Sequence, residues 1–497
     1  MNQASDPQRR TMASRPAAEL RLAAEGMLAR AAGAPLVAGN AVRILRDATE
    51  NYPAWLEAIA AARHTVLFEN YLIADDATGR RFAEALAERA RAGVQVRVIH
   101  DWMGGLGIGS TRLLRPLAEA GVEVCRFNPP RLDSPFGWLT RDHRKMIAVD
   151  GATGFVSGLC VDQRWAGDAQ RGLPPWRDTG IEIRGPAVAD IVLAFAQTWA
   201  ASGGKPFEIA TTPPAPAGGV ALRVLATQPN LAGLYRMDQM IAALARETLW
   251  LTDAYFVGIP TYVEALRAAA RDGVDVRLLV PGASDLPLVG SISRSGYRPL
   301  LKAGIRVFEW NGPMLHAKTA VADGRWARIG STNLNLASWI GNYELDVALD
   351  DEGCAVQMQA MYEEDLCNAT EIVLGPRQRI RRSQPAAPRL GSRSGRATRA
   401  AVGALRIGNS VGAAFSSRRL GPAEAGMMST VALAFLLLAV LAVTVPLAVT
   451  LPLALLALWI GVTLLVRAWR VRHGSEEDER RDEKRDEKQD EERDEKR

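Results

Sequence analysis

Two short motifs carry the residue types that phosphodiester chemistry needs. Both follow the pattern H-x-K-x-x-x-x-D, and their residues are His143, Lys145 and Asp150 in one copy and His316, Lys318 and Asp323 in the other. The chain has 497 residues with five histidines and seven lysines, against 53 arginines. Lysine is thus kept at both equivalent positions in a chain that otherwise uses arginine. The two sets therefore indicate function rather than chance.

The spacing of each motif favours one shared phosphate site. On an extended strand, residues i and i+2 point to the same face, so each histidine and its lysine can reach one phosphate. One neutral imidazole can attack phosphorus while a second, protonated imidazole releases the alcohol, because the unperturbed pKa of histidine is about 6.5. The lysines would neutralise the non-bridging oxygens. This chemistry requires no cofactor or metal, and the sequence has no metal-ligand cluster.

Segments downstream of each motif add supporting groups. Glu344 is expected to orient His316 through its second ring nitrogen, and Asp178 takes the place of Glu344 in the first copy. The phosphate-binding candidates are small residues or carry an amide donor: Gly330, Ser331 and Asn333 in the second copy, and Ser157 and Gly158 in the first.

An internal repeat predicts the elements that position these motifs. Residues 65–101 and 248–282 each read as an apolar strand, a loop, an amphipathic helix and a β-branched strand. Residues 120–128 and 303–311 match as well. This order predicts two duplicated α/β/α sandwich domains with mixed sheets, packed so that both motifs face one cleft.

Composition shifts mark the domain boundaries. The expected segments are an N-terminal arm with a short helix (1–40), domain 1 (41–205), a Pro/Gly-rich linker (206–219), domain 2 (220–375), an Arg-rich flexible segment (376–426), a transmembrane hairpin (427–467) and a charged tail (468–497). With 48% apolar residues, most of the chain can bury a core. Four cysteines without CxxC spacing argue against a disulfide framework.

The C-terminal region predicts a membrane anchor. Residues 425–466 contain no charged residue, and Pro446 and Pro452 divide them near the middle. Arginines flank both ends, so the positive-inside rule favours a helical hairpin with both ends in the cytoplasm. A single long tilted helix or a re-entrant pair is the competing interpretation. The formal net charge is +5, composed of −5 in residues 475–497 and +10 elsewhere, which suits an anionic lipid surface.

The duplicated motifs, with GSTN at 330–333, resemble the phospholipase D superfamily over about residues 41–375. Within it, residues 142–151, 176–188, 254–289 and 330–351 are similar to bacterial cardiolipin synthases, particularly the short B type without N-terminal membrane helices. The resemblance implies a phosphatidyltransferase that makes cardiolipin from two phosphatidylglycerol molecules through a phosphohistidine and releases glycerol. By analogy with related two-copy enzymes, His143 is the nucleophile and His316 the acid and base.

This resemblance leaves alternatives open. Cys160 stands where the first copy of the family usually has asparagine, and the hairpin and tail look foreign to the short type. Hydrolysis to phosphatidic acid, or head-group exchange with small alcohols, needs the same groups. A nuclease fits the basic charge but not the hairpin, and a non-catalytic scaffold would be expected to have a damaged motif. The expected partners are phosphatidylglycerol, other phospholipids and the membrane rather than nucleic acid, on the cytoplasmic side of the bacterial inner membrane. The sequence gives no oligomeric state.

Overall fold

The computed structural model describes residues 25–130, 139–210, 212–375 and 380–382, together with Leu451, Ala454 and Leu458. The predicted hairpin and charged tail lie outside the described residues, apart from those last three positions. Among the helices that the structure describes, none is long and apolar enough to cross a membrane.

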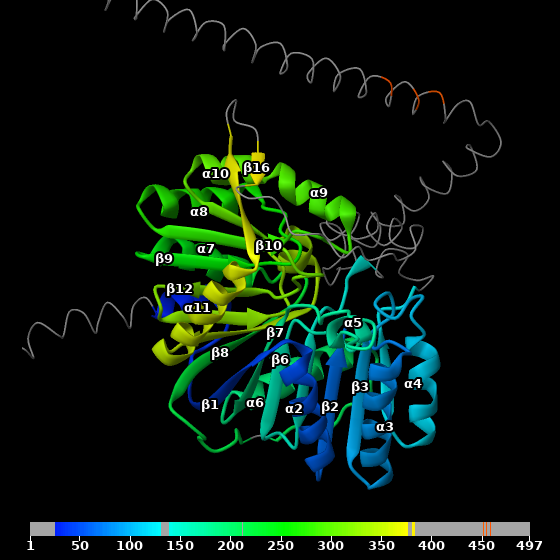
Figure 1. Ribbon diagram of the computed structural model, residues 1–497. Coiled ribbons are helices and arrows are strands. Elements are labelled where there is room, and N and C mark those ends of the chain that lie inside the picture. The colour runs from blue at the N-terminus through cyan, green and yellow to red at the C-terminus, as the bar shows by residue number, and fades with distance from the viewer. Residues whose placement is uncertain are drawn as a thin grey trace, which may run out of the picture. The chain divides into compact units, whose positions relative to one another are not determined.

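Residues 37–201, called here the first half, alternate strands and helices as the repeat predicts (Figure 1). The helix of residues 77–91 illustrates why: the Asp76 side chain accepts the Gly79 N–H at its start, Phe82 and Leu86 are buried, and Gly93 follows its end at φ 87°. The elements are β1 (Val37–Arg46), α2 (Asp47–Ala61), β2 (Thr65–Asn70), α3 (Ala77–Arg91), β3 (Gln95–Asp101), α4 (Ser110–Glu119), β4 (Glu123–Phe127), β5 (Lys145–Val149), β6 (Thr153–Ser157), α5 (Gln163–Ala166), β7 (Thr179–Arg184) and α6 (Val188–Ala201).

Residues 220–374, the second half, repeat this order with additional elements. Here too a helix begins and ends at local signals, with Pro260 in the first turn of α8 and Gly273 (φ 94°) after its end. The elements are β8 (Val220–Thr227), α7 (Gly233–Leu244), β9 (Thr248–Thr252), α8 (Pro260–Arg271), β10 (Asp275–Pro281), α9 (Pro287–Ser295), α10 (Tyr297–Lys302), β11 (Arg306–Trp310), β12 (Thr319–Ala322), β13 (Trp326–Gly330), η2 (Ala337–Gly341), β14 (Glu344–Asp350), α11 (Glu352–Cys367) and β15 (Ala369–Leu374). A further strand, β16 (Ile380–Arg382), pairs with β15, although residues 376–426 were expected to be flexible.

The strands of the two halves belong to one continuous sheet, whereas the sequence predicted a separate sheet in each domain. Within the described residues they form one 16-stranded sheet in the order β16-β15-β11-β10-β9-β12-β13-β14-β8-β1-β7-β6-β5-β2-β3-β4. The pairs β2–β3, β3–β4, β9–β10 and β10–β11 are parallel and the others antiparallel, so the sheet is mixed, as predicted. The halves join where β1 pairs with β8.

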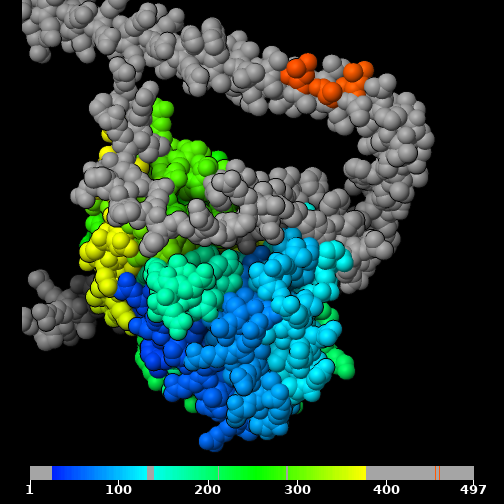
Figure 2. Space-filling view, turned by 45° about the vertical axis from the view of Figure 1, so that its right-hand side comes forward, coloured from blue at the N-terminus to red at the C-terminus, as the bar shows by residue number. Residues whose placement is uncertain are grey.

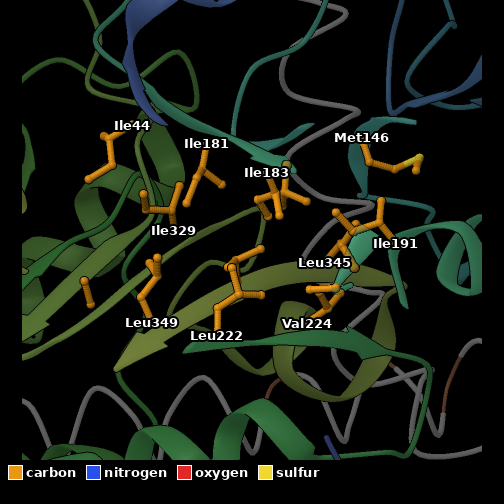
Figure 3. Packing of buried hydrophobic residues seen from close by; sticks show 14 of the residues in the cluster. Ile44, Met146, Ile181, Ile183, Ile191, Leu222, Val224, Ile329, Leu345 and Leu349 are labelled. Carbon is orange, nitrogen blue, oxygen red and sulfur yellow. The ribbon is translucent and has the colours of Figure 1, made fainter. Parts of the chain in front are cut away.

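One buried cluster includes residues of both halves and therefore fixes the halves against each other. Figure 3 shows members from each half pointing toward one another, among them Ile44, Ile181, Ile183, Leu222 and Leu345. Helices α6 and α11 contribute to the same cluster, whereas α2, α3 and α4 in one half and α7, α8 and α10 in the other pack on separate cores. In Figure 2 the turquoise segment after β6 lies where the blue first half meets the yellow and green second half. Such burial of apolar surface is the main source of stability.

Candidate active site

Each H-x-K motif pairs with a backbone segment of the opposite half. The His143 N–H donates to the Tyr343 carbonyl at 2.9 Å, and the Tyr343 N–H donates to the Arg141 carbonyl. In the same manner, the Arg177 N–H donates to the Met314 carbonyl, and the His316 N–H to the Arg177 carbonyl at 2.7 Å. These two short ladders place both motifs at the junction of the halves.

The first histidine is held by a carboxylate of the second half. His143 Nδ1 lies 2.8 Å from Glu344 Oε2, and the Ser331 hydroxyl donates to the same oxygen at 2.6 Å. The Asn342 amide donates to the other oxygen, Oε1. The prediction that Glu344 orients His316 is therefore wrong. Strand β14 begins at Glu344 directly after Tyr343, so the ladder that holds His143 also brings this carboxylate to it.

The second histidine is held by a carboxylate of the first half. His316 Nδ1 lies 2.8 Å from Asp178 Oδ2, and the indole N–H of Trp165 donates to that oxygen at 2.8 Å. Both carboxylates are buried. The two predicted supporting acids thus do contact the two histidines, but each acts across the junction. A carboxylate on Nδ1 fixes the imidazole, so Nε2 is the nitrogen that can face phosphorus. In the second half, Lys318 Nζ lies 3.0 Å from His316 Nε2.

Burial sets the protonation of the histidines. Desolvation lowers the pKa of His143 to about 4, against the opposing attraction of Glu344. Desolvation, assisted by Lys318, lowers the pKa of His316 well below 6.5. Burial opposes ionisation of Glu344 and Asp178, but the facing histidines, the nearby lysines and the hydrogen-bond donors together outweigh it and lower the pKa of each carboxyl. At neutral pH, both imidazoles of the ligand-free site are therefore neutral beside ionised carboxylates.

The two lysines occupy equivalent positions in the two halves. Lys145 donates to the carbonyl of His143, and its ammonium lies 5.2 Å from the centre of the Tyr71 ring. Lys318 donates to the carbonyl of His316 and lies 5.6 Å from the Tyr255 ring. Burial lowers the pKa of both, that of Lys318 to about 8. Two buried cations beside two histidines form a place for an anionic phosphodiester.

The two motif aspartates, which the sequence assigned to the catalytic set, lie elsewhere. Asp150 and Asp323 follow the far ends of β5 and β12, at φ 51° and 52° in the predicted Asp-Gly turns. Asp150 accepts the backbone N–H groups of residues 63–65, and Asp323 those of residues 246–248. The structure therefore does not bring either carboxylate to the histidines. Each holds the start of a neighbouring strand.

The predicted phosphate-binding residues of the second half are occupied by protein contacts. An added Cβ at Gly330 would lie 2.2 Å from Asp346 Oδ1, so glycine is required by that close approach. Besides donating to Glu344, the Ser331 hydroxyl accepts the Leu345 N–H. The Asn333 amide donates to Ser338 Oγ at 3.3 Å. Ser331 thus supports Glu344, whereas the Asn333 amide contacts only Ser338, and Asn333 Oδ1 has no hydrogen-bond partner among the described residues.

The equivalent residues of the first half differ in detail. The Ser157 hydroxyl accepts the Leu159 N–H, and a Cβ at Gly158 would lie 2.2 Å from Asp178 Oδ1. Cys160, at the place of Asn333, is buried, and burial raises the pKa of its thiol. Its carbonyl accepts the Tyr52 hydroxyl.

Sequence reasoning missed two arginines that join the halves. Arg144, inside the first motif, donates to the carbonyls of Glu344, Ala194 and Thr227. Arg177 donates from Nε to both oxygens of Asp365. Arg144 lies between the histidine and the lysine of its motif, and this position is the feature of the sequence that could have identified it.

Within the described residues, no group of three or more His, Cys, Asp or Glu side chains is arranged to hold a metal ion.

A mixed α/β fold built twice, with one histidine and lysine pair from each half, defines a phospholipase D-type enzyme. Residues 55–167 and 239–366 match the family described as "Cardiolipin synthase, PLD-like domain". Cardiolipin synthase A of Pseudomonas aeruginosa is 34% identical over 362 residues, 72% of this chain and 73% of that protein. The cardiolipin synthase of Alkalihalophilus pseudofirmus is 31% identical over 353 residues, 68% of each chain. The chain belongs to the cardiolipin synthase family and is a phospholipase D-type phosphatidyltransferase.

A solved structure shares the fold. Phosphatidylserine synthase of Haemophilus influenzae aligns with a TM-score of 0.54 and 14% identity, over 69% of this chain and 91% of that one. At this identity the likeness concerns the fold.

Proposed function

We propose that this protein makes cardiolipin from two phosphatidylglycerol molecules and releases glycerol. The observation that carries the proposal is the pair of crossed contacts, His143 with Glu344 and His316 with Asp178. They hold two imidazoles at one junction, and a two-step exchange at a single phosphorus requires one of them neutral to attack and the other protonated to release the alcohol. Family membership supports the same product.

In the first step, Nε2 of His143 attacks phosphorus of the donor, and the bond from phosphorus to the glycerol oxygen breaks. His316, protonated once the anionic donor lies beside it, supplies the proton that glycerol takes away, and it regains a proton from the acceptor in the second step. In the second step, the acceptor's primary hydroxyl attacks the phosphohistidine, loses its proton to His316, and frees His143. Lys145 and Lys318 neutralise the non-bridging oxygens in both transition states. Glu344 would stabilise the charge that His143 gains in the intermediate.

The proposed place of action is the cytoplasmic face of the bacterial inner membrane. The uncharged segment at 427–467 and its arginine flanks support this placement. The Arg-rich segment at 376–426 would lie against anionic lipid, where each basic residue is worth about 1 kcal/mol. The short B-type subclass stays a proposal that rests on segments such as 254–289.

A product assay tests the proposal. The full chain in detergent is given labelled phosphatidylglycerol, alone and with phosphatidylethanolamine, and the lipids are resolved by mass spectrometry. Cardiolipin with one glycerol per molecule is the expected result. Phosphatidic acid without cardiolipin would mean that water is the acceptor, and the protein would be a hydrolase.

Two substitutions test the mechanism. His143→Ala and His316→Ala should each abolish exchange, because the two imidazoles have different tasks in each step. His64→Ala is the matched control, since His64 lies in a turn at the far end of β2. Substantial exchange by either single motif variant contradicts the two-histidine mechanism.

A further inference from the structure

On each carboxylate, the oxygen that contacts the histidine accepts one further hydrogen bond, and the donor of that bond differs between the halves. In the second half, the Ser331 hydroxyl donates to Glu344 Oε2, the oxygen that contacts His143. In the first half, the Trp165 indole donates to Asp178 Oδ2, the oxygen that contacts His316. The two halves therefore share the contact between histidine and carboxylate but differ in the residue that donates a hydrogen bond to that carboxylate.

The repeat explains why the first half cannot use a serine at this place. The offset of 173 residues between His143 and His316 also relates Gly158 to Ser331. At Gly158 a Cβ would lie 2.2 Å from Asp178 Oδ1, so no side chain fits there while Asp178 keeps its position. A donor to Asp178 must therefore come from another residue.

Trp165 is placed for that task by the short helix α5. The Asp162 side chain accepts the Arg164 N–H at the start of this helix, and Trp165 follows with 3% of its surface exposed. The same offset relates Trp165 to Ser338, which contacts Asn333 and not the carboxylate. The donor has thus moved seven residues along the chain.

The indole also contacts the histidine itself. Its ring lies edge-to-face with the His316 ring, at 4.9 Å and 84°. The Trp176 ring packs on Trp165 at 4.5 Å and lies 6.0 Å from His316. No hydrogen bond from the Trp176 indole to a protein group is found among the described residues, so Trp176 shares the packing but not the contact with Asp178.

We propose that Trp165 is a positioning residue for His316, acting through Asp178. Its N–H fixes the carboxylate oxygen that holds Nδ1, and its ring limits rotation of the imidazole, so that Nε2 stays directed at phosphorus. This inference rests on the two-histidine site of the proposed function, but not on the identity of the lipid product.

Removing the indole N–H should shift the pKa of His316, which a change in packing alone should not do. Asp178, Lys318 and Lys145 are the charged groups that face His316. Asp178 would lose a donor that favours its ionised form, and a carboxylate with fewer donors is a stronger base. His316 would then hold a proton to higher pH, and the limb of the pH profile that belongs to it would move upward.

The test compares Trp165→Phe with Trp176→Phe in the full chain, with bis(p-nitrophenyl) phosphate as the probe. Trp165→Phe should lower kcat about 10- to 100-fold, by analogy with the loss of a group that orients a metal-binding histidine. KM should change less than twofold, and one pH limb should move upward. Trp176→Phe should leave the pH profile in place. Trp165→Tyr is carried in parallel, so that the comparison holds if Trp165→Phe does not fold.

Equal losses in the Trp165 and Trp176 variants with unmoved pH profiles would overturn the proposal and leave packing as the role of the indole. Full kcat in a folded Trp165→Phe would overturn it as well. A wild-type protein that cleaves the probe but makes no cardiolipin would refute the proposed lipid product. The role of Trp165 would still be tested, because the variants are compared on the probe and not on the lipid.

Discussion

The aspartates that complete the two motifs should contribute to the stability of the fold but not to catalysis. Asp150 accepts the N–H groups of Arg63, His64 and Thr65 at 2.7–2.9 Å, at the end of β5 opposite His143. The five residues of β5 span about 15 Å, too far for any proton transfer. Asp150→Ala should therefore destabilise the fold and leave the chemistry intact.

The contacts set the magnitude of that loss. Hydrogen bonds to a charged group contribute about 1.5–3 kcal/mol each when buried. Asp150 is half-buried rather than fully buried, so about 2 kcal/mol for all three bonds is a reasonable total after screening. The backbone N–H groups lower the pKa of Asp150 against the effect of desolvation. Its contribution is thus complete above about pH 4 and is lost as pH falls through the folded-state pKa.

Thermal unfolding and kcat, measured on the same samples, check this prediction. Because the two halves share one sheet and one core, they should unfold as one unit of residues 37–374, for which a loss of about 2 kcal/mol corresponds to roughly 3 °C in Tm. Asp150→Asn is the matched control: asparagine tolerates φ 51° and keeps one acceptor oxygen, so about half the shift is expected. The result that would refute the reasoning is a folded Asp150→Ala protein whose kcat falls as far as that of His143→Ala.

Three further predictions concern the site. Glu344→Gln should slow formation of the phosphohistidine about 10²–10³-fold, whereas Asp178→Asn should chiefly slow breakdown of the phosphohistidine. Alkaline quenching followed by peptide mass spectrometry measures the trapped intermediate and so separates the two effects. The reverse pattern would contradict the crossed contacts. Because the pKa of His143 is lowered from 6.5 to about 4, the unfolded chain binds its proton first, and stability should fall by about 3 kcal/mol between pH 6.5 and 4; a Tm that is flat over this window contradicts it. Cys160→Asn should lower Tm without raising kcat, since a buried amide without a partner costs about 1–3 kcal/mol; a gain in kcat would show that the amide binds phosphate.

The features that the sequence predicted correctly are those encoded by short-range patterns. The two histidine and lysine pairs lie at the starts of β5 and β12, although the histidines precede these strands and do not lie on them as the i and i+2 spacing predicts. The matched apolar and amphipathic segments predict a duplicated mixed α/β fold. Both depend on a few neighbouring residues and on strand or helix periodicity, which the printed sequence displays directly.

The carboxylate pairing was missed because it depends on long-range topology. His143 and Glu344 are 201 residues apart, and Asp178 and His316 are 138 apart. A repeat suggests that each copy is complete, so the sequence favours pairing within a copy. Nothing local to Glu344 reveals that the backbone before β14 pairs with the segment leading into β5. Trp165 and Asp178 are only 13 residues apart, but the segment between them is mostly irregular, so no strand or helix periodicity predicts the contact of the indole with the carboxylate.

From these crossed contacts we expect that neither half works without the other. If each half held its own histidine and carboxylate, a duplication could be undone and each half could keep a weak site. Instead each half lends its acid to the other's histidine, and Arg144 and Arg177 tie the same segments across the junction. An isolated half would leave a buried carboxylate without its imidazole and an imidazole without its acid, both costly in a low-dielectric interior. The apolar cluster shared by the halves therefore does more than stabilise the fold, because it holds together two sites that are each incomplete alone.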